Sequence, residues 1–225
     1  MKISIFMIES AITKSLFGFI SNQLKNKEII IKTETKDTIV FDVDGILINW
    51  LSQLPFFCVR MGIDPKMALK NYTRPKHLPA SELFGIQNER IANDLLRKYN
   101  LEHGKYMTAF PDAVDHLHKL AKEYNLVALT KFGSSVEHYT VRKYNLETFF
   151  PGCFSELISI DYHEDKSSYF TQIANTHSRV IAFVDDQLEY IEDVRSHHPD
   201  VNCIHLNRYD DNADIQSVEQ IYEML

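Results

Sequence analysis

A short apolar run that ends in two aspartates constrains this chain most. Residues 38–41 (Thr-Ile-Val-Phe) lead directly to Asp42, Asp44 and Gly45. An uninterrupted run of this kind is typical of a strand that is buried on both faces of a parallel sheet. Ligands bind beyond the carboxyl ends of such strands, where two aspartates could hold a divalent cation and one could attack a phosphorus atom. The alternative is a turn in which Asp and Gly simply end the strand.

Short apolar runs alternate with helical patterns in the second half of the chain. Strands are predicted at 126–130, 157–160, 180–184 and 201–206, and helices at 111–124, 134–144, 167–176, 187–197 and 214–224. This alternation predicts βαβ units, and therefore an α/β protein with a doubly wound, Rossmann-like parallel sheet as its core. Nearer the N-terminus, a helix is predicted at 8–25 and a short strand at 28–33.

The segment 48–108 has a different character. It contains four prolines and no strong strand pattern, and short helices are predicted at about 51–60, 65–71, 80–84 and 87–99. We therefore predict a small α-helical cap at 48–108 and an α/β core made of 1–47 and 109–225. Five basic residues of the cap could meet a phosphate ester, although each is more simply a solvated surface charge: Arg60, Arg74, Lys76, His77 and Lys105.

Charge and cysteine usage limit the partners and the setting. The formal net charge of −7 does not indicate a nucleic-acid surface, so no duplex partner is expected. Three widely spaced cysteines without a CxxC motif favour reduced thiols and a cytoplasmic location. Glu9 and Lys14 interrupt the N-terminal apolar stretch, so we expect neither a secretory signal nor a transmembrane segment. Residues 1–36 could bind a protein partner, but a helix packed on the main domain is the simpler interpretation.

Polar residues follow the predicted strands at the same edge of the sheet. They are Asp42 and Asp44, Thr130, and the pair Asp185 and Asp186, while Lys166 opens a helix. Carboxylates gathered at one edge repel one another unless a hard cation such as Mg²⁺ neutralises them. A lysine and a hydroxyl would then satisfy phosphoryl oxygens. Taken singly, each residue has a simpler explanation: Thr130 as a strand residue, Lys166 as a surface ion-pair partner, and the two aspartates as a helix cap.

These segments, taken in order, resemble the four motifs of haloacid dehalogenase superfamily phosphatases. The matching segments are 41–45, 126–130, Lys166 with 167–170, and 182–186. The resemblance spans about 38–206, and four motifs in order are far more specific than one Asp-x-Asp. It implies that an insert placed directly after the nucleophile strand forms a cap over the site and selects the substrate.

The resemblance also implies a role for each acid. Asp42 would attack the phosphoryl group and become an aspartyl phosphate. Asp44 would protonate the leaving oxygen and then activate the hydrolytic water, and an acid at this position favours a phosphatase over a dehalogenase. Mg²⁺ would be held by Asp42, by the backbone carbonyl of Asp44 and by Asp185, with Asp186 as an outer, water-mediated partner.

The remaining motif residues would bind the transferring group. Thr130 and Lys166, together with Lys131, would contact the phosphoryl oxygens. The predicted function is therefore a Mg²⁺-dependent phosphomonoester hydrolase that acts on a phosphorylated substrate. A nucleotidase or phosphoprotein phosphatase that uses the same site, or a non-catalytic protein-binding module with the same fold, stays open as an alternative.

Overall fold

The computed structural model describes residues 35–72 and 78–225. The predicted helix at 8–25 and strand at 28–33 lie outside these ranges, as do Arg74, Lys76 and His77. Residues 36–225 form one compact unit. Within the described ranges, no helix combines the length and the apolar character needed to cross a membrane.

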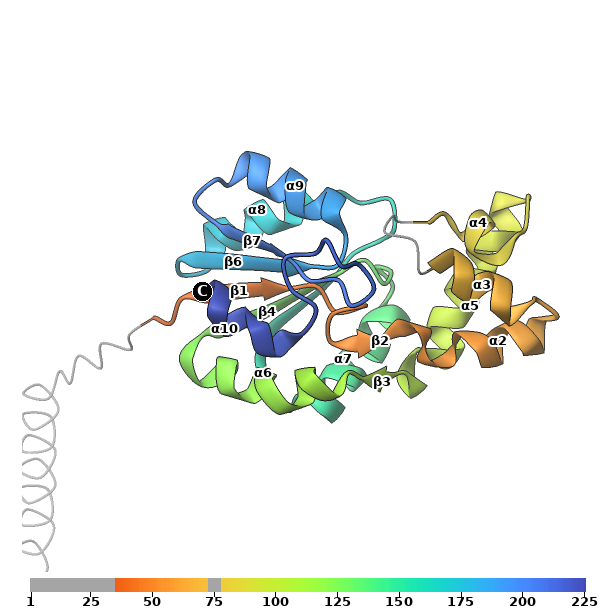
Figure 1. Ribbon diagram of the computed structural model, residues 1–225, viewed down its shortest axis with the longest axis horizontal. Helices are drawn as coiled ribbons and strands as arrows, with labels where there is room; N and C mark the ends of the chain where they lie inside the picture. Colours follow the sequence, from red (N-terminus) through yellow and green to blue (C-terminus); the bar gives the residue numbers. More distant parts are fainter. Residues whose placement is uncertain (1–34, 73–77) are drawn as a thin grey trace, which may run out of the picture. The chain divides into compact units, whose positions relative to one another are not determined.

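A five-stranded sheet forms the centre of the core (Figure 1). Its strands are β1 (Thr38–Phe41), β4 (Asn125–Thr130), β5 (Phe154–Ser159), β6 (Val180–Asp185) and β7 (Asn202–His205). All neighbours are parallel, in the order β5-β4-β1-β6-β7. The direction of winding reverses at β1, which is where ligands bind in doubly wound sheets. The predicted fold class is therefore confirmed.

The register of the sheet brings the strand ends level with one another. Phe41 lies opposite Ala128 on one side and opposite Val184 on the other. Asp42, the next residue, still donates its backbone N–H to the carbonyl of Val184 at 2.8 Å. The side chains that follow β1, β4 and β6 therefore emerge at one edge of the sheet.

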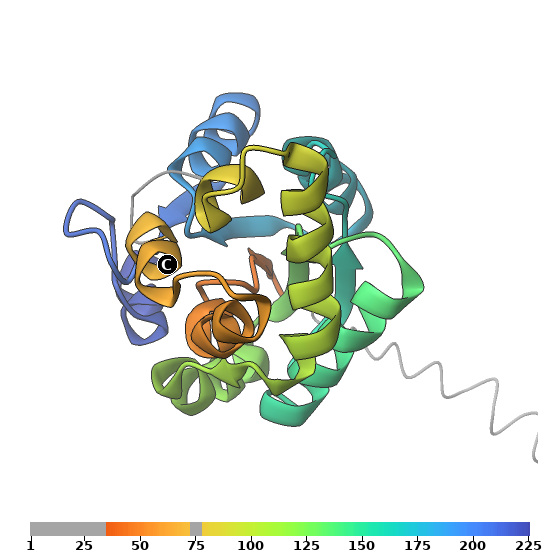
Figure 2. The ribbon, with the colours of Figure 1, turned by 90° about the vertical axis from the view of Figure 1, so that its right-hand side faces the viewer.

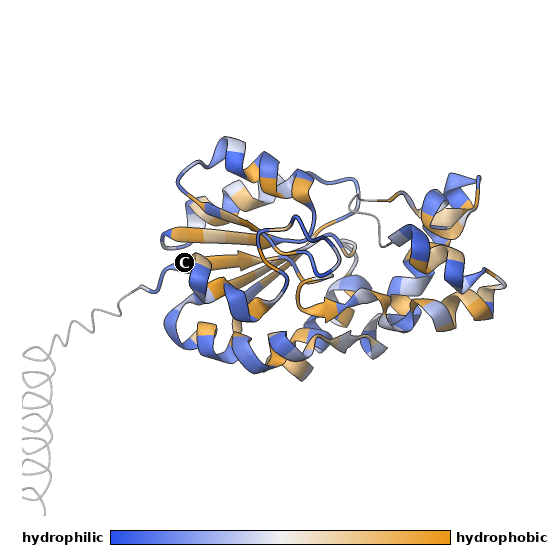
Figure 3. Cartoon of the chain, in the orientation of Figure 1, coloured by the Kyte–Doolittle hydropathy of each residue, from blue (hydrophilic) through white to orange (hydrophobic). Residues whose placement is uncertain are grey.

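Helices cover both faces of the sheet. One face packs against α6 (Pro111–Glu123), α7 (Val136–Phe149) and the C-terminal α10 (Ile221–Met224), and the other against α8 (Lys166–Thr176) and α9 (Leu188–His197). An apolar cluster lies on each face of the sheet, and successive residues of β1 alternate between them. Ile39 and Phe41 belong to the first cluster and Val40 to the second. Figure 3 shows the same pattern, with apolar strands and hydrophilic outer helix surfaces.

Helices make up most of the chain between two very short strands. Strands β2 (Ile48–Asn49) and β3 (Thr108–Ala109) pair antiparallel, and between them lie α2 (Leu54–Met61), α3 (Pro65–Tyr72), α4 (Ala80–Phe84) and α5 (Glu89–His103). These helices lie beyond the carboxyl ends of the sheet strands (Figures 1 and 2). We refer to 48–108 as the insert and keep its role as a cap as a proposal. The sequence analysis missed β2 and β3 because two residues are too few to show a period.

The predicted terminal helix at 214–224 is wrong in its first half. Ile215 forms a bridge with Leu206, and the carboxylate of Asp214 accepts from the backbone N–H of His205 at 2.9 Å, so this stretch is extended. Helical structure begins after Ser217, which forms a capping box with Gln220. A 3₁₀ turn at Val218–Gln220 then leads into α10.

Candidate active site

A buried lysine joins the acids of two neighbouring strands. Lys166, the first residue of α8, donates from Nζ to Asp42 Oδ1 at 2.7 Å and to Asp185 Oδ2 at 2.5 Å. Its side chain is only 2% exposed. Burial lowers the pKa of Lys166, but the carboxylates of Asp185 and Asp42 more than offset this effect and leave the pKa raised. Lys166 therefore stays charged and pairs with these acids rather than with a surface partner.

Three carboxylates converge beside this lysine. Asp42, Asp185 and Asp186 each offer an oxygen atom within 4.8 Å of the others. Burial, followed by the charges of Asp42 and Asp185, raises the pKa of Asp186 well above its usual value. Crowded, desolvated carboxylates stabilise a bound cation, and an all-oxygen donor set suits Mg²⁺. The residues present therefore fit the metal that the sequence motifs imply.

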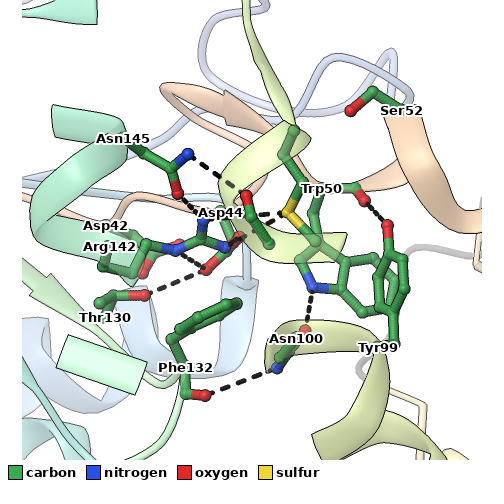
Figure 4. Close-up of polar contacts among 12 residues, drawn as sticks. Asp42, Asp44, Trp50, Ser52, Tyr99, Asn100, Thr130, Phe132, Arg142 and Asn145 are labelled. Carbon is green, nitrogen blue, oxygen red and sulfur yellow. Dashed lines mark hydrogen bonds and ion pairs between the residues drawn. The ribbon is translucent and has the colours of Figure 1, made fainter. Parts of the chain in front are cut away.

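Asp44 has a separate set of contacts. Its carboxylate accepts from both Nε and Nη2 of Arg142, the former at 3.3 Å, and from the hydroxyl of Thr130 at 3.1 Å (Figure 4). Burial raises the pKa of Asp44 to about 6, with Arg142 pulling in the opposite direction and Asp42 adding to the rise. A pKa of this size suits a group that exchanges protons near neutral pH.

Arg142 is the site residue that the sequence analysis missed. Its side chain is fully buried, donates from Nη1 to Asn145 Oδ1 at 2.7 Å, and lies 3.7 Å from the ring centroid of Phe132. One signal was available in the sequence. The buried residues His138, Arg142 and Asn145 repeat at helical spacing along α7, so this helix turns a polar stripe inward.

Gly45, which follows Asp42 and Asp44, leaves room for the carboxylate of Asp186. Gly45 has a φ of +81°, and a Cβ built there would lie 2.5 Å from Asp186 Oδ2. Arg208 fixes this loop from the other side, donating to the carbonyls of Gly45 at 3.3 Å and Ile46 at 2.8 Å. The same guanidinium forms two bonds with Asp112 at 2.9 and 3.0 Å, which ties the loop to the first turn of α6.

A cavity of about 160 Å³ lies over these acids, and both the core and the insert line it. Lys131, whose Nζ lies 5.0 Å from the ring centroid of Tyr190, belongs to its wall. Burial and the charge of Lys166 lower the pKa of Lys131. Two other predicted basic residues point elsewhere. Arg60 pairs with Glu102 and Lys105 lies over the ring of Tyr106, and neither belongs to the described lining.

No family model matches this chain. An uncharacterized 32.4 kDa protein of Enterobacteria phage T4 is 32% identical to it over 152 residues, which are 67% of this chain and 54% of that protein. The chain therefore spans about half the length of the curated relative that it matches.

Solved structures share the fold at low sequence identity. A candidate phosphatase from Clostridium difficile matches with a TM-score of 0.61 at 17% identity, over 85% of this chain and 99% of that chain. A candidate haloacid-dehalogenase-like hydrolase from Bacillus subtilis, bound to magnesium, matches with a TM-score of 0.56 at 13% identity, over 84% and 98%. An L-2-haloacid dehalogenase from Xanthobacter autotrophicus matches with a TM-score of 0.51 at 15% identity, over 79% and 80%. The chain thus has the fold of the haloacid dehalogenase superfamily, as its four sequence motifs predict.

Proposed function

We propose that the chain is a Mg²⁺-dependent hydrolase of phosphomonoesters that works through an aspartyl phosphate on Asp42. The observation that carries this proposal is the different surroundings of two acids that are two residues apart. Asp42 belongs to the carboxylate cluster and pairs with Lys166, whereas Asp44 is held by Arg142 and Thr130. Carboxylates with such distinct environments are suited to separate roles, one as nucleophile and one as acid and base.

The metal would be held at the carboxylate cluster. Asp42, Asp185 and Asp186 supply the side-chain oxygens, and the backbone carbonyl of Asp44 is a further candidate ligand. When bound, Mg²⁺ supplies positive charge that offsets the carboxylates and the phosphoryl oxygens. The magnesium bound to the Bacillus subtilis protein of the same fold supports this choice of ion.

The chain's own residues account for each transfer of a proton or an electron pair. A carboxylate oxygen of Asp42 attacks phosphorus, and the bond between phosphorus and the ester oxygen breaks. Asp44 gives its proton to that departing oxygen. Asp44 then takes a proton from the water that attacks the phosphoryl aspartate, which releases phosphate and restores Asp42. Lys166, with Thr130 and Lys131 beside it, donates hydrogen bonds to the phosphoryl oxygens.

The test is phosphate release from an aryl phosphate, followed with Mg²⁺ and with excess chelator. We expect turnover with Mg²⁺, loss of turnover with chelator, and no turnover in Asp42→Asn. Asp115→Asn is the matched control, because Asp115 is an exposed aspartate on α6. Rapid acid quench with labelled substrate should place the label on the peptide that contains Asp42. Substantial turnover by Asp42→Asn, with no label on that peptide, would exclude the covalent mechanism.

A further inference from the structure

The cavity over the acid cluster has an ionic floor and aromatic walls. Six aromatic residues line it, from the insert and from three loops and one helix of the core: Trp50, Tyr72, Phe132, Tyr162, Tyr190 and Tyr209. Aromatic walls offer flat, weakly hydrated surfaces on which another ring can stack. The volume of about 160 Å³ is close to the roughly 150 Å³ of an apolar cavity known to take up benzene.

Three residues of the cavity wall, Trp50, Asn100 and Tyr162, are joined by hydrogen bonds. The indole N–H of Trp50 donates to Asn100 Oδ1 at 2.9 Å (Figure 4). The amide of Asn100 donates to the hydroxyl of Tyr162 at 2.5 Å. The hydroxyl of Tyr162 in turn donates to the carbonyl of Phe132 at 2.9 Å. On this part of the wall, a leaving group therefore meets ring surfaces whose polar atoms already have partners.

Two of the rings form a stacked pair in the cavity wall. Trp50 and Tyr72 are stacked, with ring centroids 5.3 Å apart and an angle of 17° between the planes. Tyr72 ends α3, and burial together with the carboxylates of Asp186, Asp44 and Asp42 raises the pKa of its hydroxyl. Trp50 and Tyr72 line the same cavity as Asp42, Asp44, Asp185 and Asp186. In the bound ester, before Asp42 attacks, the leaving group would share this cavity with the ring pair.

We infer that the substrate is a small phosphomonoester whose leaving group carries one aromatic ring. Aryl-alkyl phosphates and pyrimidine nucleoside monophosphates share this chemistry. The inference rests on the proposed function and adds the substrate class to it. Stacking on the cavity walls acts in the bound substrate as well as in the transition state, so the ring should lower KM more than it raises kcat.

Matched substrate pairs test the inference without altering the protein. The first pair is benzyl phosphate and cyclohexylmethyl phosphate, which have similar size and similar alcohol leaving groups but differ in flatness. The second is uridine 5′-monophosphate and ribose 5-phosphate, which differ in the presence of the base. We expect the ring-bearing member of at least one pair to have a kcat/KM about 10-fold higher, mainly through KM. The pair that shows the difference identifies the source of the ring.

Variants of Tyr72 connect the preference to the cavity wall. Tyr72→Leu should remove most of the ring preference and Tyr72→Phe should keep it. Tyr144→Leu is the matched control, because Tyr144 is an exposed tyrosine on α7. Equal kcat/KM within both pairs, with phosphate still released, would overturn the inference and leave the proposed function in place. No phosphate release from any of the four esters would instead overturn the proposed function. If Tyr72→Leu does not fold, the substrate pairs and Tyr72→Phe still decide the question.

Discussion

Replacing Arg142 with methionine is the perturbation that the structure constrains most closely. The change keeps a long apolar side chain but removes the guanidinium that bonds Asp44 and Asn145 and lies over Phe132. Removing one partner of a buried ion pair typically costs about 3–5 kcal/mol. The side chain of Asp44 is 22% exposed, so water can partly rehydrate it, and we expect the low end of this range, about 3 kcal/mol.

A double-mutant cycle measured by chemical denaturation checks this value. In the double variant Arg142→Met/Asp44→Asn no carboxylate is left without its cation, so the loss of stability should be about 1–2 kcal/mol smaller than the two single losses added together. Arg195→Met is the matched control. Arg195 is exposed and donates from Nη2 to the carbonyl of Cys203 at 2.9 Å, so its removal should cost about 1 kcal/mol. A loss below 1 kcal/mol for Arg142→Met, or losses that simply add, would refute the reasoning.

Three further predictions concern the acids. Asp44→Asn should slow hydrolysis of alkyl phosphates by about 10²- to 10⁴-fold and slow an activated aryl phosphate less, as steady-state kinetics will show; equal losses would mean that Asp44 has no part in proton transfer. Gly45→Ala should lower activity and stability more than Gly152→Ala. Both glycines have positive φ, but a Cβ at position 45 would meet Asp186, whereas nothing lies within 4 Å of a Cβ at position 152. Equal effects of the two substitutions in both assays would contradict the crowding argument. Mg²⁺ at 100 times its Kd should raise the thermal midpoint by about 5–10 °C, and Asp185→Asn should abolish the shift, since a ligand that binds only the native state stabilises it.

The sequence predicts those parts of the molecule that follow from local pattern. The apolar strands at 38–41, 126–130 and 180–184 are continuous runs because helices cover both faces of the sheet. The convergence of Asp42 with Asp185 follows from the geometry of parallel strands. Lys166 opens α8, as expected, whereas its bonds to Asp42 and Asp185 were not predicted.

The sequence does not predict contacts that depend on how distant elements pack. The helical spacing of His138, Arg142 and Asn145 is visible in the sequence, but only the packing of α7 shows that this polar stripe faces inward and that Arg142 contacts Asp44. The aromatic walls likewise combine residues that lie far apart in the sequence, such as Trp50, Tyr162 and Tyr190. The cytoplasmic location and a protein partner bound through 1–36 stay predictions.

The short ribbon of β2 and β3 has a consequence for folding. Before β1 can pair with β4, the chain must close a loop that contains residues 42–124, and the entropy of closure grows with the logarithm of loop length. Pairing of Ile48 with Ala109 holds the two ends of the insert side by side, so the loop that is left consists only of the segments on either side of the ribbon. This shortening lowers the entropic cost of pairing β1 with β4 by about 1 kcal/mol. The ribbon itself closes the loop of the insert, and doubling that loop would add only about 0.6 kcal/mol, so the insert can change in length with little effect on how readily the central sheet assembles.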